Sequence, residues 1–453
     1  MSSKFERDLS EGHVARQLIT FALPFIISTL VQNLYSAVDL IIVGQFAGTN
    51  SLSGVNNATS VVNLTTTCAV GFCTGATVLI GRFLGAGQRE KIKTAIGTLI
   101  TFLMAAAVLF SALILCLTGP IFRLIDTPAE ALPEALRYLR VSACGFVFIF
   151  GYNIFSAVLR GMGDSRHPFI FVVIASLTNI VLDLLAVAVL GMGAAGAALA
   201  TIISQALSVV LCVIFLKRSD FIFDFRLSSF GIDGPMLRDL LRISIPTTIQ
   251  NVVTSLSFTV ILVIANQLGV MGSAASGIGG RITSFAIVPI ISLGNAISAM
   301  CAQNFGAGKP ERAVRTMWVG LALGLSINVT LFAIVQIFTR PLVHIFTSDE
   351  ALIKNAVVYL HSFSLDYLAV AVFNVFVNFA MGTGRTLFPS VLNMCSSVLI
   401  RIPASYILAI ALSGGLKGLG LAAPLATAVS TVILMIWFFS GTWKKHLEGE
   451  SKQ

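Results

Sequence analysis

Charged residues, histidines and metal-type cysteine patterns are all scarce in this sequence. Charged residues make up 11% of the 453 positions, whereas soluble domains carry about 25%. This shortage excludes an ordinary soluble protein, a coiled coil and a disordered chain. All seven cysteines lie inside apolar runs without zinc-type spacing. The sequence therefore predicts neither a disulfide scaffold nor a zinc site, and no cofactor is expected.

Long apolar runs take the place of the missing charge. Hydrophobic residues make up 56% of the chain and the mean hydropathy is +0.92. A bilayer core is spanned by about 20 apolar residues in a helix. The runs predict twelve spans, at 17–45, 53–81, 95–118, 138–159, 168–190, 194–216, 240–265, 274–301, 316–338, 357–380, 389–412 and 419–440. Pro24, Pro246 and Pro289 lie inside runs, where they are expected to bend the helices.

The lysines and arginines indicate how the spans are oriented. With the N-terminus placed in the cytoplasm, 21 of these residues fall in cytoplasmic segments and seven in external ones. Short cytoplasmic loops of membrane proteins carry such an excess of positive charge. We therefore expect a multi-pass protein of the plasma membrane with both termini in the cytoplasm. The net charge of +9 is explained by this bias, and no nucleic-acid partner is expected.

The two halves of the chain repeat each other with a shift of 221 residues. The repeated segments are Phe83-Leu84-Gly85-Ala86-Gly87 with Asn304-Phe305-Gly306-Ala307-Gly308, Gly161-Met162-Gly163 with Gly382-Thr383-Gly384, and Tyr138-Leu139 with Tyr359-Leu360. Six spans in each half give repeats of parallel topology, related by an axis along the membrane normal. The sequence thus predicts an all-α integral membrane protein with an N-lobe at 1–216, a cytoplasmic linker at 217–239 and a C-lobe at 240–453. Lobes of this kind bind their substrate between the repeats.

Three acidic residues lie within the apolar runs: Asp39, Asp183 and Asp366. A charged side chain at the bilayer centre costs about 2.5–3.5 kcal/mol, so such residues are functional candidates. Asp39, Asp183 and Thr201 lie at one depth, about 10 Å below the outer surface at 1.5 Å per helical residue. Asn179 precedes Asp183 by four residues and shares its helix face. The four side chains form a plausible site for Na⁺ or a proton; unrelated interhelical hydrogen bonds are the alternative.

Several motifs together resemble the multidrug and toxic compound extrusion (MATE) family over essentially the whole chain. They are Pro24 with Asp39 and Gly44, the glycine run Gly71, Gly75 and Gly81, Arg160-Gly161-Met162-Gly163-Asp164, and Gly196-Ala197-Ala198-Leu199-Ala200-Thr201. Asn179 with Asp183, and Arg401-Ile402-Pro403, resemble the DinF-like and archaeal branch. The resemblance implies two six-helix lobes and efflux of organic cations and other drugs, driven by H⁺ or Na⁺. It also implies that Asp39, Asn179, Asp183 and Thr201 form the coupling site, and that they are metal ligands only if the ion is Na⁺.

The C-terminal half departs from the pattern of the NorM-like branch. That branch has acidic residues in its seventh and tenth spans, whereas this seventh span offers Gln250, and Asp366 lies about four residues too early. Ile261 and roughly Ala404 stand at the repeat positions of Asp39 and Asp183, so coupling is expected to be asymmetric. Gln250, Asp366 and Arg401 remain secondary polar candidates.

Two other functions are weighed against an antiporter. A flippase for lipid-linked sugars would be expected to line its path with basic residues, but Arg401 is the only one deep in a span. An intramembrane enzyme is not expected, because the five histidines lie near span ends or in loops. The expected partners are small drug molecules and membrane lipids, and we expect a monomer. H⁺ and Na⁺ coupling both stay open at this point.

Overall fold

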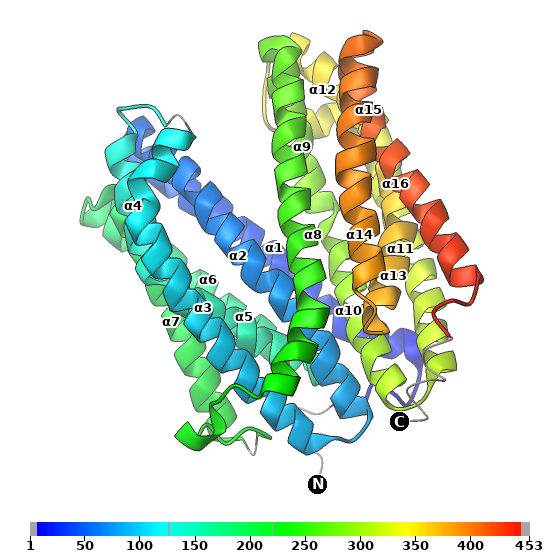
Figure 1. Ribbon diagram of the computed structural model, residues 1–453. Coiled ribbons are helices and arrows are strands. Elements are labelled where there is room, and N and C mark those ends of the chain that lie inside the picture. Colours follow the sequence, from blue (N-terminus) through cyan, green and yellow to red (C-terminus); the bar gives the residue numbers. More distant parts are fainter. Residues whose placement is uncertain (1–6, 126, 220, 445–453) are drawn as a thin grey trace. The chain divides into compact units, whose positions relative to one another are not determined.

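The structure is a computed structural model that describes residues 7–125, 127–219 and 221–444. Within these ranges the regular elements are all helices (Figure 1). Those of the first half are α1 (Val14–Phe46), α2 (Gly48–Gly85), α3 (Arg89–Leu124), α4 (Leu132–Cys144), α5 (Phe146–Gly161), α6 (Arg166–Asp183), the π-helix η1 (Leu184–Val189), α7 (Gly193–Lys217) and the short η2 (Leu227–Ser229). Those of the second half are α8 (Gly234–Gln267), α9 (Gly269–Ala286), α10 (Val288–Gly306), α11 (Pro310–His344), α12 (Glu350–Phe363), α13 (Leu365–Gly382), α14 (Leu387–Cys395), the π-helix η3 (Ser396–Arg401), α15 (Ile402–Tyr406), the π-helix η4 (Ile407–Ala411) and α16 (Gly415–Phe439).

The described helices confirm the expected membrane architecture. Ten spans are long and apolar enough to cross a bilayer, and there are twelve if two bent pairs each count as one. The pair α4–α5 bends by 51° and the pair α9–α10 by 41°. Pro289 is the second residue of α10, as the sequence predicted for a bend there. The bend at Gly145 has no proline; a Cβ there would meet Ile202 Cγ1 at 2.3 Å, so the Ile202 side chain on α7 would have to move to admit it.

The backbone repeats with the period that the motifs indicated. Left-handed glycines recur in pairs 221 or 222 residues apart, at Gly48 and Gly269 (φ 83° and 81°), Gly87 and Gly308 (68° and 67°), Gly163 and Gly384 (86° and 79°), and Gly193 and Gly415 (57° and 54°). Only glycine adopts this region without steric cost. The turns between corresponding spans are therefore built alike in both halves.

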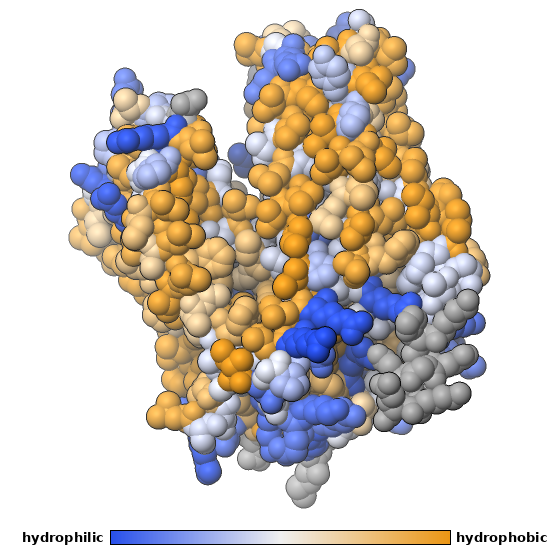
Figure 2. All heavy atoms as spheres, in the orientation of Figure 1, coloured by the Kyte–Doolittle hydropathy of each residue, from blue (hydrophilic) through white to orange (hydrophobic). Residues whose placement is uncertain are grey.

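Large apolar side chains lie on the outer surface of the helices. Examples are Leu109 at 68% exposure, Val189 at 73% and Ile337 at 72%. Figure 2 shows such residues over much of the visible helix surface, with hydrophilic residues nearer the helix ends. Exposed apolar surface on this scale is typical of a lipid-facing protein.

The chain divides into two compact units, each with its own apolar cores. Of the described residues, unit 1 holds those within 7–8 and 27–248, and unit 2 holds those within 9–26 and 249–444. α1 and α8 are each divided between these units, and the lobes expected at 1–216 and 240–453 stay a prediction. Phe146 and Phe150 are buried in unit 1, and Phe376 and Phe379 in unit 2.

The first part of α8 packs into unit 1 against glycines of α2. The Ser244 hydroxyl donates to the Phe72 carbonyl at 2.9 Å, and the Thr247 hydroxyl donates to the Gly71 carbonyl at 3.1 Å. A Cβ on Gly71 would lie 2.6 Å from the Cα of Thr248. Small residues let membrane helices approach this closely and hydrogen-bond across the interface.

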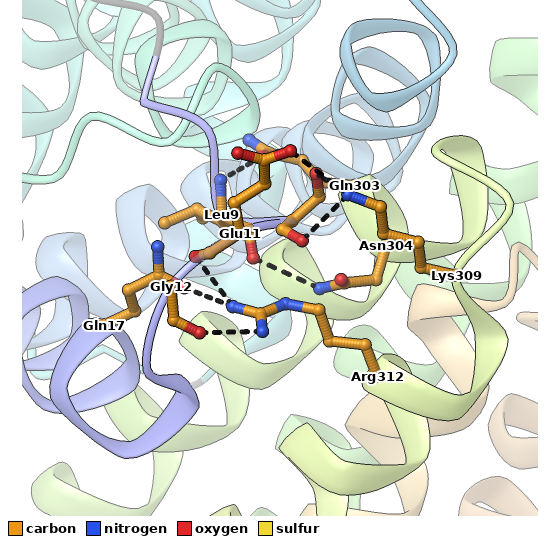
Figure 3. A network of polar contacts seen from close by, with 9 residues as sticks. Leu9, Glu11, Gly12, Gln17, Gln303, Asn304, Lys309 and Arg312 are labelled. Atoms are coloured by element: carbon orange, nitrogen blue, oxygen red, sulfur yellow. Dashed lines mark hydrogen bonds and ion pairs between the residues drawn. The ribbon is translucent and has the colours of Figure 1, made fainter.

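The first part of α1 and the segment before it belong to unit 2, where polar contacts hold them. The Leu9 amide donates to Gln303 Oε1 at 3.1 Å. The Arg312 guanidinium donates to the carbonyls of Glu11 and Gly12, both at 2.8 Å, and to Gln17 Oε1 at 2.7 Å (Figure 3). These contacts join residues 9–17 to the end of α10 and the start of α11, across almost 300 residues of sequence.

Candidate functional site

Unit 1 brings together the four residues expected to form an ion site. Asp39 lies on the part of α1 that belongs to unit 1, Asn179 and Asp183 lie on α6, and Thr201 lies on α7. The Asn179 amide donates to the Thr201 hydroxyl at 3.4 Å. The Asp39 and Asp183 carboxyl groups lie close enough to act on each other electrostatically. Three helices of unit 1 thus contribute the four polar side chains.

The site has more buried hydrogen-bond acceptors than donors. Asp183 is completely buried and Asn179 is 1% exposed. Four oxygens have no hydrogen-bond partner: Asp39 Oδ1, Asn179 Oδ1, and Asp183 Oδ1 and Oδ2. Unpaired buried polar atoms are rare and costly, and they indicate a missing water, ion or proton. Because all four atoms are acceptors, the chemistry of the site fits a proton or a small cation.

A small cavity adjoins Asn179 and Thr201. Its volume is about 10 Å³, roughly the room that one water molecule needs. Its polar lining comes from residues of unit 1: Gln32, Tyr35, Tyr152, Ser176, Asn179, Thr201, Ser204 and Gln205. The space is suited to a water or a Na⁺ ion and is far too small for a drug.

The donor set suits a hard cation such as Na⁺. In the described part of the chain, no group of three or more His, Cys, Asp or Glu side chains is placed to hold a metal. Carboxylate, amide and hydroxyl oxygens together are instead hard ligands, which suit a weakly bound hard cation. The same oxygens accept a proton equally well, so the donor set alone admits both ions.

Two tyrosines near the carboxylates were missed by the sequence reasoning. Tyr35 and Tyr138 both interact electrostatically with Asp39 and Asp183. A signal for Tyr35 was present, since it precedes Asp39 by four residues on the same helix. Tyr138 was noticed only as a marker of the repeat, and its place beside the carboxylates depends on how α4 packs.

A change of helix type follows the site immediately. α6 ends at Asp183 and continues as the π-helix η1. π-helical turns are rare and are often found at functional sites. The second half has a π-helix η4 at the corresponding position, preceded by a further π-helix, η3, that ends at Arg401. The wider backbone is therefore a feature of both units at this level.

The secondary polar candidates lie in unit 2, and two of them are neighbours. Asp366, at the start of α13, is 6% exposed and interacts electrostatically with Arg401. The guanidinium carbon of Arg401 lies 4.4 Å from the centre of the Phe258 ring. Gln250, on α8, is 7% exposed with Oε1 unpaired, and no described contact joins it to the other two. Asp366 and Arg401 therefore form a separate polar cluster.

Duplicated bundles of membrane-spanning helices with ionisable residues buried inside them are typical of membrane transporters. The MatE family model matches residues 24–185 and 246–407, once in each half. The chain therefore belongs to the MATE family, as the motifs predicted. Its assignment to the DinF-like branch stays a prediction.

Individual relatives are similar over nearly their whole length. The chain is 26% identical over 445 residues to the probable multidrug resistance protein YoeA of Bacillus subtilis, covering 96% of each protein. It is 26% identical over 439 residues to the FAD transporter of Shewanella oneidensis, covering 93% of this chain and 94% of the relative. A solved MATE transporter, described as outward-facing, superposes with a TM-score of 0.91 at 23% identity, covering all of both chains, and shows the same fold.

Proposed function

We propose that this protein is a secondary active antiporter that exports organic cations and other drugs from the cell in exchange for H⁺ or Na⁺. The observation that carries the proposal is the group of four unpaired, buried acceptor oxygens on Asp39, Asn179 and Asp183. The names of relatives such as YoeA, a probable multidrug resistance protein, support multidrug efflux. Membership of the MATE family supports a transporter and not an enzyme.

The exchange would follow from competition for the same negative charge. With both carboxylates ionised, the site attracts a cation. When a proton or Na⁺ binds between Asp39 and Asp183, it neutralises negative charge whose burial in the helix bundle is otherwise unfavourable in free energy. The electrostatic hold on a cationic substrate then weakens, and α1 and α6 are free to repack. Binding of ion and substrate would therefore oppose each other, which is what antiport needs.

The other residues of the site have narrower roles in this proposal. The Thr201 hydroxyl accepts from the Asn179 amide. That bond leaves the Asn179 carbonyl oxygen directed to the ion. The cavity lined by Tyr35 and Gln205 admits the water that a hydrated ion sheds or a proton follows. The π-helix η1, next to Asp183, supplies a segment whose hydrogen-bond pattern can change as the carboxylate is filled.

The same proposal places the protein in its membrane. The bias of lysine and arginine toward one side supports cytoplasmic termini and residence in the plasma membrane. A monomer suffices for the mechanism, since all four residues of the ion site come from one unit of one chain.

Vesicle transport tests the function. The purified full chain is reconstituted, a pH or Na⁺ gradient is imposed, and accumulation of a fluorescent organic cation is followed. We expect gradient-driven accumulation that stops when an ionophore collapses the gradient. Asp39→Asn and Asp183→Asn should each abolish it while expression and monodispersity are kept. Asp239→Asn, an exposed carboxylate on α8, is the control. Normal gradient-driven transport in either site variant would refute the coupling role.

A further inference from the structure

Arg401 is a membrane-embedded arginine whose hydrogen-bond donors are largely unused. Its guanidinium stacks on Phe258, and its electrostatic neighbours are Asp366 and Tyr359. In the described part of the chain, Arg401 donates no hydrogen bond and forms no ion pair within 4.0 Å. A guanidinium carries five N–H donors in a fixed planar arrangement. An arginine kept in a span for structural reasons is expected to use them on carbonyls or a carboxylate.

Asp366 also keeps unused bonding capacity. It is 94% buried, and its Oδ1 atom has no hydrogen-bond partner. Its other interactions are with Thr427 and, at longer range, with Arg401. The two opposite charges thus lie close enough to act on each other without forming an ion pair. An unpaired, buried carboxylate oxygen within electrostatic range of a guanidinium with unused donors is suited to a polar ligand.

The repeat relates this cluster to the ion site of unit 1. The two family matches begin 222 residues apart, and this shift places Arg401 at the position of Asn179. Thr427, which bonds Asp366, stands at the position of Gln205. Tyr359 repeats Tyr138, and each tyrosine interacts with the charged groups of its own unit. The two clusters therefore correspond at these three positions, and in unit 2 a guanidinium stands where unit 1 has the Asn179 amide.

We propose that the Arg401 cluster of unit 2 is a second ligand site, which binds the carboxylate or phosphate group of an amphiphilic aromatic substrate. This inference rests on the proposed export function, because it names a class of exported compound beyond organic cations. Unit 1 then supplies the ion-coupling charge, and unit 2 recognises the anionic group of a substrate.

The surroundings of Arg401 define the chemistry of the ligand. A planar guanidinium binds carboxylate or phosphate oxygens through two parallel hydrogen bonds, with specificity that a point charge lacks. Phe258 is 50% exposed and offers an apolar face to a ring carried beside the anion. Asp366 repels a second negative charge. The site should therefore prefer a monoanionic or zwitterionic group to a dianion.

A matched pair of dyes tests this site directly. One is a xanthylium dye with a free benzoate, and the other is its methyl ester, which differs only in lacking the anion. Binding of each to the purified full chain in neutral detergent is measured by fluorescence anisotropy. We expect Arg401→Gln to weaken binding of the benzoate dye about tenfold and to change ester binding by less than about twofold. Arg281→Gln, an exposed arginine on α9, should change neither.

Two further variants keep the test decisive if Arg401→Gln does not fold. Arg401→Lys retains the charge but not the planar donors, so it should lose part of the benzoate preference. Asp366→Asn removes the repulsion and should tighten benzoate binding about threefold without affecting the ester. Equal losses for both dyes, no loss at all, or a wild-type protein that does not prefer the benzoate dye would overturn the proposal.

Two more measurements distinguish a substrate from a lipid as the source of the anion, and test the anion site separately from the transport function. Adding phosphatidylglycerol to the binding assay should not displace the benzoate dye; displacement would assign the site to a lipid headgroup and overturn the role in export. Benzoate selectivity in detergent without gradient-driven transport in vesicles would refute the antiporter and leave the anion site standing. Transport of both dyes without Arg401-dependent selectivity would refute the anion site alone.

Discussion

The neighbouring carboxylates of unit 1 predict that one monovalent ion enters for each cation exported. Asp39 and Asp183 act on each other electrostatically, and three of their four oxygens are buried and unpaired. Two like charges held this closely in a low-dielectric bundle share one bound positive charge more readily than they bind two. Exchange of one H⁺ or Na⁺ for one monocation then moves no net charge across the membrane.

The predicted effect of voltage follows from this balance. A second coupled ion would add about 2.3 kcal/mol per 100 mV to the driving force. At about 1.4 kcal/mol for each factor of ten, that corresponds to roughly fiftyfold accumulation. One-for-one exchange predicts no accumulation of the monocation from voltage alone. If the ion is H⁺, each unit of pH gradient would still drive about tenfold accumulation.

Inverted vesicles with both ion gradients held at zero and the potential clamped measure this difference. A monocationic dye should not accumulate at either polarity. A dicationic dye is the positive control: its exchange for one ion carries one net charge inward, so a lumen-negative potential should drive its uptake. Accumulation of the monocation at a lumen-positive potential would refute single-ion coupling and show that more than one positive charge is exchanged.

Three further expectations concern single side chains. Asn179→Ala and Thr201→Ala should weaken ion affinity yet keep gradient-driven transport, because both leave the two carboxylates in place; complete loss of coupling in either would contradict this ranking. Gly75→Ala should destabilise the protein by about 1–3 kcal/mol in thermal unfolding, because the new Cβ would lie 2.8 Å from Ser244 Cα. Gly277→Ala serves as the control, since a Cβ on Gly277 would meet nothing within 4 Å. Arg312→Gln should speed amide hydrogen exchange at residues 9–13, because it removes the hydrogen bonds to the Glu11 and Gly12 carbonyls and to Gln17. The exposed Arg315→Gln is the control and should leave exchange unchanged. Equal exchange rates in the two variants would show that the Arg312 contacts do not hold the segment.

Much of the architecture was predictable because hydropathy and charge along the chain report directly on the bilayer. Apolar runs of about 20 residues can be satisfied only as spanning helices. The 221-residue repeat was visible in glycines such as Gly87 and Gly308, since both turns need a left-handed residue. Acidic residues within apolar runs were conspicuous for the same reason, and equal depth along their helices was enough to group Asp39 with Asp183 and Thr201.

Contacts between helices were decided only by the tertiary structure. The sharing of α1 and α8 between the two units depends on the close fit of Ser244 and Thr247 against the glycines of α2, and the linker in the chain does not reveal it. Tyr138 lies within electrostatic range of the carboxylates, and Arg401 stops short of an ion pair with Asp366, because of how neighbouring helices are packed. Association of helices in a membrane rests on shape and local hydrogen bonds between distant segments. The pattern of residues along the sequence indicates the depth of a residue in the membrane but not which residues of other helices it contacts.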